Sequence, residues 1–350
     1  MDYPIDYNGL TDPTVTDYVK SSKPSVARTL FDVVVLCWGV IFGAIGLFLY
    51  APSIWTYLLA FLVVSSRMNG CLTLAHDGWH TSLVSNRKWN DFIAGWLCSY
   101  PFGSVYGSAR AGHLAHHKYL GTEADPDRPM HIEADKHTLA DFVGHFARHM
   151  FIGQLIISFS KYLLPKRSDH ANPAACAAVK AELNEDSKAA KRVPEFAYVV
   201  VCQALIGSSL WYLSGHWWTY FAVWFFPIVT LGTMCYFFRA FGDHGRLTTD
   251  PTGPLEGRLV SIPHQLAWER AFVSPYEFNF HAEHHLYASV PHQHLPKLHQ
   301  LLRQKDAYKR QVIVRNNYSA FLVSYVREIS ATPKPAAIAE TGGNSLSDGS

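Results

Sequence analysis

The sequence predicts an all-α integral membrane protein, in which four transmembrane helices form two hairpins and carry a helical cap on the cytoplasmic side. Two observations support this fold class. Four segments are apolar and close to the roughly 20 residues that cross a bilayer, and they lie at about residues 30–50, 54–75, 196–213 and 217–238. The links within each pair are about three residues long and contain no Lys or Arg.

The first and fourth segments are the most apolar, and the first contains Asp32 as its only charge. The second contains Arg67 and Asn69, which are unusual inside a span. An arginine within a membrane is functional by default, and we expect Arg67 to reach lipid headgroups or to pair with Asp32 or an acyl headgroup.

Composition agrees with a protein that is only partly in the membrane. Charged residues make up 17% of the 350 residues, below the roughly 25% of soluble proteins, but the mean hydropathy is only +0.01. The net charge of +2 argues against nucleic acid as a partner, and nothing indicates the oligomeric state. We divide the chain into a cytoplasmic N-terminal segment (1–29), a membrane catalytic domain (30–310), a C-terminal cytoplasmic helix (311–330) and a disordered tail (331–350).

The distribution of basic residues sets the orientation. Apart from Arg67, every Lys and Arg lies on one side of this topology. The positive-inside rule then places both termini and the middle segment in the cytoplasm. We therefore expect a multi-pass protein of a bacterial inner membrane or the endoplasmic reticulum.

Nine of the 19 histidines fall into a pattern. Two clusters read HxxHH, one reads HxxxH, and one histidine stands alone; the residues are His76, His80, His113, His116, His117, His244, His281, His284 and His285. Residues three and four apart share one helix face, and neutral imidazole is a common metal ligand. So many imidazoles exceed one tetrahedral zinc and suit two metal ions with open positions, which points toward iron.

These clusters converge only if the chain between them stays on one side. Ile54 to His76 is 22 residues, or about 33 Å of helix, so the first cluster emerges at the cytoplasmic face. A crossing by the apolar stretch Phe92–Tyr106 would separate it from the second cluster. We therefore interpret this stretch, and Met150–Leu164, as interfacial, and residues 171–192 as a solvated helix or loop.

HDGWH at 76–80, HLAHH at 113–117 and HAEHH at 281–285 resemble the three histidine boxes of the membrane fatty acid desaturase superfamily, a similarity that covers roughly residues 30–310. The resemblance implies that the nine histidines bind two iron ions at the cytoplasmic face and are catalytic. It also implies dioxygen as co-substrate, with His244 as the extra ligand that follows the fourth span.

The match has departures. Ala240 replaces an Asn of some acyl-CoA desaturases, and His281 replaces the Gln typical of front-end desaturases. The sequence shows no HPGG motif of a haem-binding domain. We therefore expect electrons from a separate ferredoxin or cytochrome.

Carboxylates near the clusters are expected to orient the ligands. Ligating imidazoles commonly donate their second N–H to a carboxylate, and Asp243 and Glu283 are the preferred acceptors. Asp125 and Asp127 lie in a Pro-containing turn, where they can equally organise the loop. Three further histidines are expected to pack and not to bind metal: His292, His294 and His299.

The leading functional prediction is a desaturase that introduces a double bond into a fatty acyl chain. A hydroxylase or ketolase of the same superfamily, acting on a lipid, carotenoid or other apolar metabolite, is the alternative. A metal transporter is disfavoured because its ligands belong near the bilayer midplane, whereas these flank the spans.

Overall fold

The structure is a computed structural model that describes residues 7–122, 124–128, 138–149, 195–247, 249–250 and 259–331. These residues are mostly helical, and four helices are long and apolar enough to cross a membrane: Val26–Tyr50, Ile54–Trp79, Phe196–Ser214 and Phe221–His244. The prediction of four helices of spanning length and composition is confirmed. The second and fourth helices extend past their predicted ends at residues 75 and 238, so both carry histidines of the clusters.

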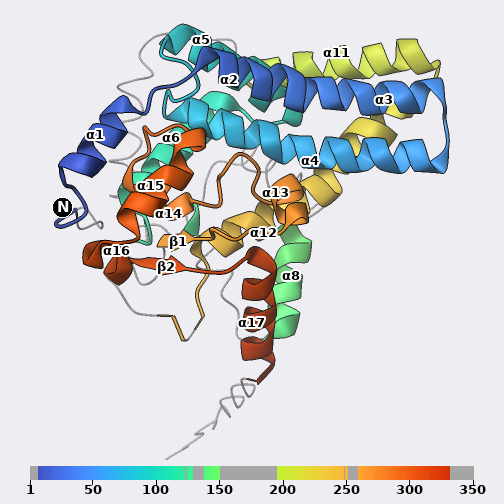
Figure 1. Ribbon diagram of the computed structural model, residues 1–350. Coiled ribbons are helices and arrows are strands. Elements are labelled where there is room, and N and C mark those ends of the chain that lie inside the picture. Colours follow the sequence, from blue (N-terminus) through green and yellow to red (C-terminus); the bar gives the residue numbers. More distant parts are fainter. Residues whose placement is uncertain are drawn as a thin grey trace, which may run out of the picture.

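The first two spans pack side by side (Figure 1). The first consists of α2 (Val26–Leu30), η1 (Phe31–Gly39) and α3 (Val40–Tyr50), and the second is α4 (Ile54–Trp79). The label η marks π-helical segments such as η1 and short 3-10 helices. Ser53 and Thr56 form a capping box, in which each side chain accepts a hydrogen bond from the backbone N–H of the other. These two side chains thus provide hydrogen-bond acceptors for backbone amides at the start of the second helix.

The third span is α11 (Phe196–Ser214), and the fourth consists of η4 (Phe221–Phe225), η5 (Ile228–Gly232) and α12 (Thr233–His244). Gly215 ends α11 with a φ of 72°, a left-handed conformation that glycine adopts without strain. Tyr220 after this turn donates a hydrogen bond to Gln203 of α11 at 2.8 Å, which ties the third and fourth spans together.

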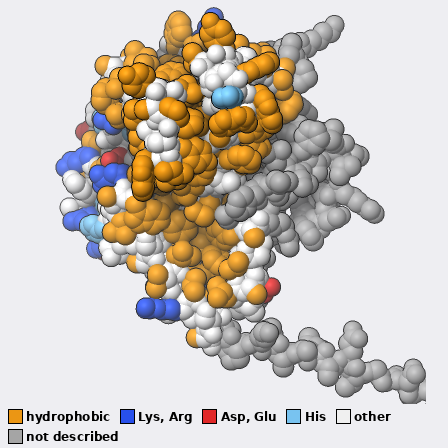
Figure 2. All heavy atoms as spheres, turned by 90° about the vertical axis from the view of Figure 1, so that its right-hand side faces the viewer, with side chains coloured by type: hydrophobic (Ala, Val, Ile, Leu, Met, Phe, Trp, Pro, Cys, Tyr) orange, Lys and Arg blue, Asp and Glu red, His pale blue; other side chains and the backbone are white. Residues whose placement is uncertain are grey.

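Apolar side chains cover the outer ends of these helices, and Figure 2 shows them gathered on the face that α3, α4 and α11 present. Trp55 is 76% exposed and Phe42 is 64% exposed. Large exposed apolar surfaces mark contacts with protein or membrane. With four helices of spanning length, this surface indicates a membrane protein.

Most of the remaining elements form what we call the cap, residues 80–122 and 259–317. Its first part contains α5 (Arg87–Phe92), η2 (Ile93–Ser99), η3 (Tyr100–Phe102) and α6 (Tyr106–Tyr119). Its second part contains β1 (Leu259–Ser261), α13 (Ala267–Phe272), α14 (His281–Leu286), η6 (His292–His294), α15 (Leu295–Leu302), α16 (Asp306–Gln311) and β2 (Val312–Val314). β1 and β2 pair in parallel, with Val260 opposite Ile313.

Among the described residues, three helices lie outside the cap and the spans. α1 (Pro13–Ser21) packs on α15, and Tyr18 donates a hydrogen bond to the carbonyl of His294 at 3.0 Å. α17 (Tyr318–Ala331) and α8 (Leu139–His149) pack on each other and on α12.

Some expectations differ from the structure or lie outside it. The helix expected over 311–330 begins at Tyr318, because residues 312–314 form β2. The apolar stretch Phe92–Tyr106 consists of η2, η3 and the start of α6, and the clusters on either side of it lie together. Residues 150–164, 171–192 and the tail after Ala331 lie outside the described residues.

Candidate metal centre

The nine clustered histidines come together in two adjoining groups. The five-histidine group consists of His76, His80, His113, His117 and His284. The four-histidine group consists of His116, His244, His281 and His285. Within each group, one nitrogen of every ring lies within 4.8 Å of the corresponding atoms of the others. All nine predicted site residues are therefore placed at one centre.

Helical spacing explains how the chain divides its histidines. His113 and His117 are one helical turn apart on α6 and share the five-histidine group, while His116 between them faces the other group. α14 shows the converse arrangement, because His281 and His285 face the four-histidine group and His284 faces the five-histidine group. Residues at i, i+3 and i+4 lie on one side of a helix, and the packing of α6 and α14 divides each set of three between the groups, so each HxxHH motif serves both groups.

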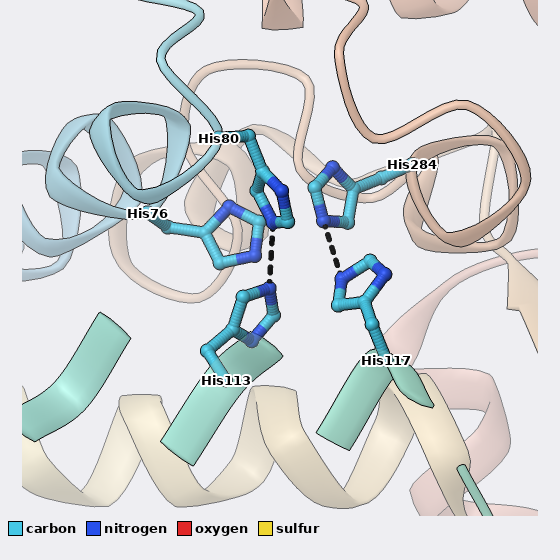
Figure 3. A group of neighbouring side chains, drawn as sticks. All are labelled: His76, His80, His113, His117 and His284. Carbon is cyan, nitrogen blue, oxygen red and sulfur yellow. Dashed lines mark hydrogen bonds between the residues drawn. The ribbon is translucent and has the colours of Figure 1, made fainter. Parts of the chain in front are cut away.

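The imidazoles of the five-histidine group point toward one another, as Figure 3 shows. The Nε2 atoms of His80 and His113 are 2.9 Å apart, and those of His117 and His284 are 3.0 Å apart. His76 lies against His113, with ring centres 4.2 Å apart.

The four-histidine group is built in the same way. The Nε2 atom of His281 lies 2.9 Å from that of His244 and 3.0 Å from that of His285. The rings of His117 and His285 stack with centres 4.2 Å apart, so the two groups share a boundary. Two ions bound here would be close neighbours.

Burial keeps most of these imidazoles neutral. Burial, reinforced by the neighbouring imidazoles, holds the pKa of His113, His117, His281, His284 and His285 well below the usual value. Burial also lowers the pKa of His80 to about 4. A neutral imidazole has a free lone pair for a metal, so the site is ready to coordinate at neutral pH.

His116 is the exception, because it has a carboxylate partner. Burial alone would lower its pKa, but a 2.8 Å hydrogen bond between its Nδ1 and Asp125, together with the charge of Asp125, raises it. This bond leaves Nε2 of His116 to face the four-histidine group. Such carboxylate–histidine pairs fix the ring and its tautomer.

The two carboxylates preferred from the sequence have other partners, so the prediction that they accept a ligand's N–H is wrong. Asp243 accepts a 2.6 Å hydrogen bond from Tyr318, and its other oxygen lies 3.9 Å from Nε of Arg239. Glu283 accepts hydrogen bonds from His299 and Tyr308. On α14, Glu283 is two residues after His281 and therefore lies on the opposite side of the helix from the imidazoles.

Sequence reasoning also missed a buried charged triad, formed by Asp32, Asp77 and His292. Nδ1 of His292 lies 2.8 Å from Asp77, and Nε2 lies 3.3 Å from Asp32. Burial would lower the pKa of His292, but the two carboxylates outweigh it and raise the pKa to about 9. Asp32 is the only charged residue in the apolar segment 30–50, and a buried carboxylate requires a nearby cation. This feature of the sequence could have indicated that Asp32 has a cationic partner.

The expected pairing of Arg67 with Asp32 is wrong. Asp32 instead accepts from Nε of Arg28 at 2.6 Å, one helical turn earlier. Arg67 donates to the hydroxyl of Ser66 at 2.7 Å and to the carbonyl of Ala271 at 3.3 Å.

The donor set fits bound metal. Metal–imidazole bonds are about 2.0–2.1 Å long, so ligand nitrogens on opposite sides of one ion lie about 4 Å apart, in keeping with the spread of each group. Both ring nitrogens of His76 are buried without a hydrogen-bond partner among the described residues. A metal ion would satisfy ligand atoms of this kind.

A cavity of about 400 Å³ opens beside both groups. His76 and His113 line it from the five-histidine group, and His116, His244 and His281 from the other. The rest of its wall is largely apolar, with Met68, Leu72, Trp79, Phe237 and Phe278. A molecule in this cavity would lie directly against the metal centre.

Comparison with known proteins identifies the family. A model described as fatty acid desaturase matches residues 52–316. Dihydrorhizobitoxine desaturase from Bradyrhizobium elkanii is 22% identical over 263 residues, which cover 74% of this chain and 71% of that protein. Together they support an oxidoreductase. The prediction from the three histidine boxes is confirmed: the chain belongs to the fatty acid desaturase family.

Proposed function

We propose that this protein is an oxygen-dependent di-iron desaturase that introduces a double bond into the acyl chain of a lipid. The observation that carries the proposal is the convergence of nine histidines, five of which line a largely apolar cavity. Bound at the two groups, iron would supply the oxygen chemistry that removes hydrogen from an unactivated C–H bond.

The residues of this chain would hold and orient the substrate. Trp79 and Phe278 line the cavity next to His76 and His113, and their rings provide apolar contacts for a hydrocarbon. Such a lining excludes water from the reacting carbon. The cavity reaches Met68 and Leu72 of α4, so an alkyl chain can approach from the membrane-spanning helices.

We further propose that the centre and both termini face the cytoplasm and that a separate ferredoxin or cytochrome supplies electrons. The distribution of Lys and Arg supports the orientation. The electron donor rests on the expectation from the sequence and is tested by adding each donor to the purified enzyme.

The proposal is tested with His113→Ala and His284→Ala, beside His216→Ala as an exposed control. The first two should abolish the product while the protein still accumulates in membranes, and the control should keep full activity. Normal activity in both site variants would refute the di-iron assignment. Mass spectrometry separates desaturation, which removes two hydrogens, from the alternative hydroxylation, which adds one oxygen.

A further inference from the structure

Among the described residues that line the cavity, Arg239 is the one Lys or Arg. Arg239 on α12 is only 7% exposed, and it lines the cavity one turn before His244. A buried cation in a largely apolar wall costs free energy unless its charge and its N–H donors are compensated. Its partners therefore indicate what the cavity is built to receive.

The protein compensates Arg239 incompletely. A guanidinium has five N–H donors, and Nη1 donates to the hydroxyl of Thr73 at 3.2 Å. Nε is buried without an acceptor among the described residues, because the nearest carboxylate oxygen, on Asp243, is 3.9 Å away. The other oxygen of Asp243 already accepts from Tyr318. Nη2 makes no hydrogen bond among the described residues and, unlike Nε, is not fully buried, so it is the donor that can reach an acceptor in the cavity.

Aromatic rings hold Arg239 in place beside the metal centre. Its guanidinium carbon lies 4.4 Å from the ring centre of Phe278 and 4.9 Å from that of Tyr236. The same Phe278 ring lies 4.5 Å from His76 and 4.9 Å from His281, one histidine of each group. Phe278 therefore contacts both Arg239 and one histidine of each group, so a molecule bound by Arg239 would lie near the histidine centre.

We propose that Arg239 binds the carboxylate of the substrate inside the cavity, so that the enzyme acts on a free acid and oxidises carbons close to that carboxylate. The inference rests on the proposed function and specifies its substrate class. Arginine pairs with carboxylate through two parallel hydrogen bonds. Asp127 and Asp243 also line the cavity, so a singly charged carboxylate meets less repulsion there than a doubly charged phosphate.

Arg67 provides a matched comparison. It too lies on a membrane-spanning helix, but it donates to Ser66 and Ala271 and is absent from the cavity wall. A change at Arg67 removes the same charge without altering the cavity.

The experiment compares acids with their methyl esters. Metal-loaded protein in lipid nanodiscs is titrated with straight-chain acids from butanoate to dodecanoate and with the corresponding esters, and Kd is taken from the shift of the thermal midpoint. Wild-type protein and Arg67→Gln should bind at least one acid about tenfold more tightly than its ester, whereas Arg239→Gln should bind both equally. Bonds to charged groups contribute about 1.5–3 kcal/mol, which corresponds to at least that factor. Arg239→Lys should retain part of the preference.

Iron content, measured on every variant, should remain unchanged. The proposal is overturned if wild-type protein binds no acid or binds acid and ester equally, or if Arg239→Gln keeps the preference. If Arg239→Gln does not accumulate, the wild-type and Arg239→Lys measurements decide. The binding measurement requires no turnover. If the protein binds acid as expected but desaturates nothing, the proposed function is refuted and the assignment of Arg239 stands.

Discussion

Nδ1 of His116 lies 2.8 Å from a carboxylate oxygen of Asp125, and both side chains are buried. Asp125 in turn accepts hydrogen bonds from the backbone N–H groups of Gly121 and Asp127, at 3.0 Å and 2.9 Å. The loop after α6 therefore fixes the carboxylate, and the carboxylate fixes a histidine of the four-histidine group. Asp125 performs the role that the sequence suggested for Asp243 and Glu283.

Asp125→Asn should weaken metal binding about 10- to 100-fold, the usual effect of removing such a partner. Competition with a chelator of known affinity measures the change. Asp306→Asn is the control, because that carboxylate is exposed on α16 and pairs with Lys309. Equal iron affinity in both variants would contradict the role assigned to Asp125.

The triad around His292 makes stability depend on pH. Its pKa is raised from 6.5 to about 9 in the folded protein, so the stabilisation is fully present below about pH 6.5 and is lost as the pH rises through 9. At 1.36 kcal/mol per pKa unit it is on the order of 3 kcal/mol. His292→Gln should therefore lower the thermal midpoint at pH 6 and have little effect at pH 10. His216→Gln, in an exposed position, is the control and should not change the thermal midpoint at either pH. If His292→Gln lowers the midpoint equally at pH 6 and pH 10, the role of the triad is refuted.

Gly78 marks a close approach between α4 and η2. A Cβ atom at this position would overlap the Cβ of Ala94. The carbonyl of Gly78 also accepts hydrogen bonds from Asn90 at 2.7 Å and from Tyr106 at 3.0 Å. Gly78→Ala should cost about 1–3 kcal/mol of stability, as overpacking does.

The matched control for this substitution is Gly46→Ala, since a Cβ there meets no atom within 4 Å. Thermal midpoints of the two variants in the same detergent give the comparison. Equal midpoints would show that η2 does not pack on α4 as described.

Removal of metal should destabilise the cap. Nine imidazoles from four helices share the centre, and a ligand that binds only the folded state at 1,000 times its Kd contributes about 4 kcal/mol. Chelation should lower the thermal midpoint and expose the cap to protease, and added iron should restore both properties. Identical midpoints with and without chelator would contradict a structural contribution of the metal.

The sequence was sufficient for the features that follow from local periodicity. Apolar length predicts the four spans, and the i, i+3, i+4 spacing predicts that the imidazoles of His113, His116 and His117 lie on one side of a helix. The division of these residues between two groups also depends on how α4, α6, α12 and α14 pack, which no single helix specifies.

Contacts between distant segments were beyond the sequence. His292 follows the last histidine box, yet it binds Asp77 of the first box and Asp32 of the first span. The β1–β2 pair was missed because each strand has only three residues and its partner lies about 50 positions away. Both features depend on tertiary packing, which overrides short local signals.

The alternation of neighbouring histidines between the two groups has a consequence for biogenesis. α14 contributes ligands to both groups and contains only six residues, too few to form a helix outside the folded protein. Neither group is complete until this last segment has been synthesised and has docked against α4, whose own ligands precede it by some 200 residues. We therefore expect each site to bind metal only after α14 has been made and has docked, so that the two sites form together.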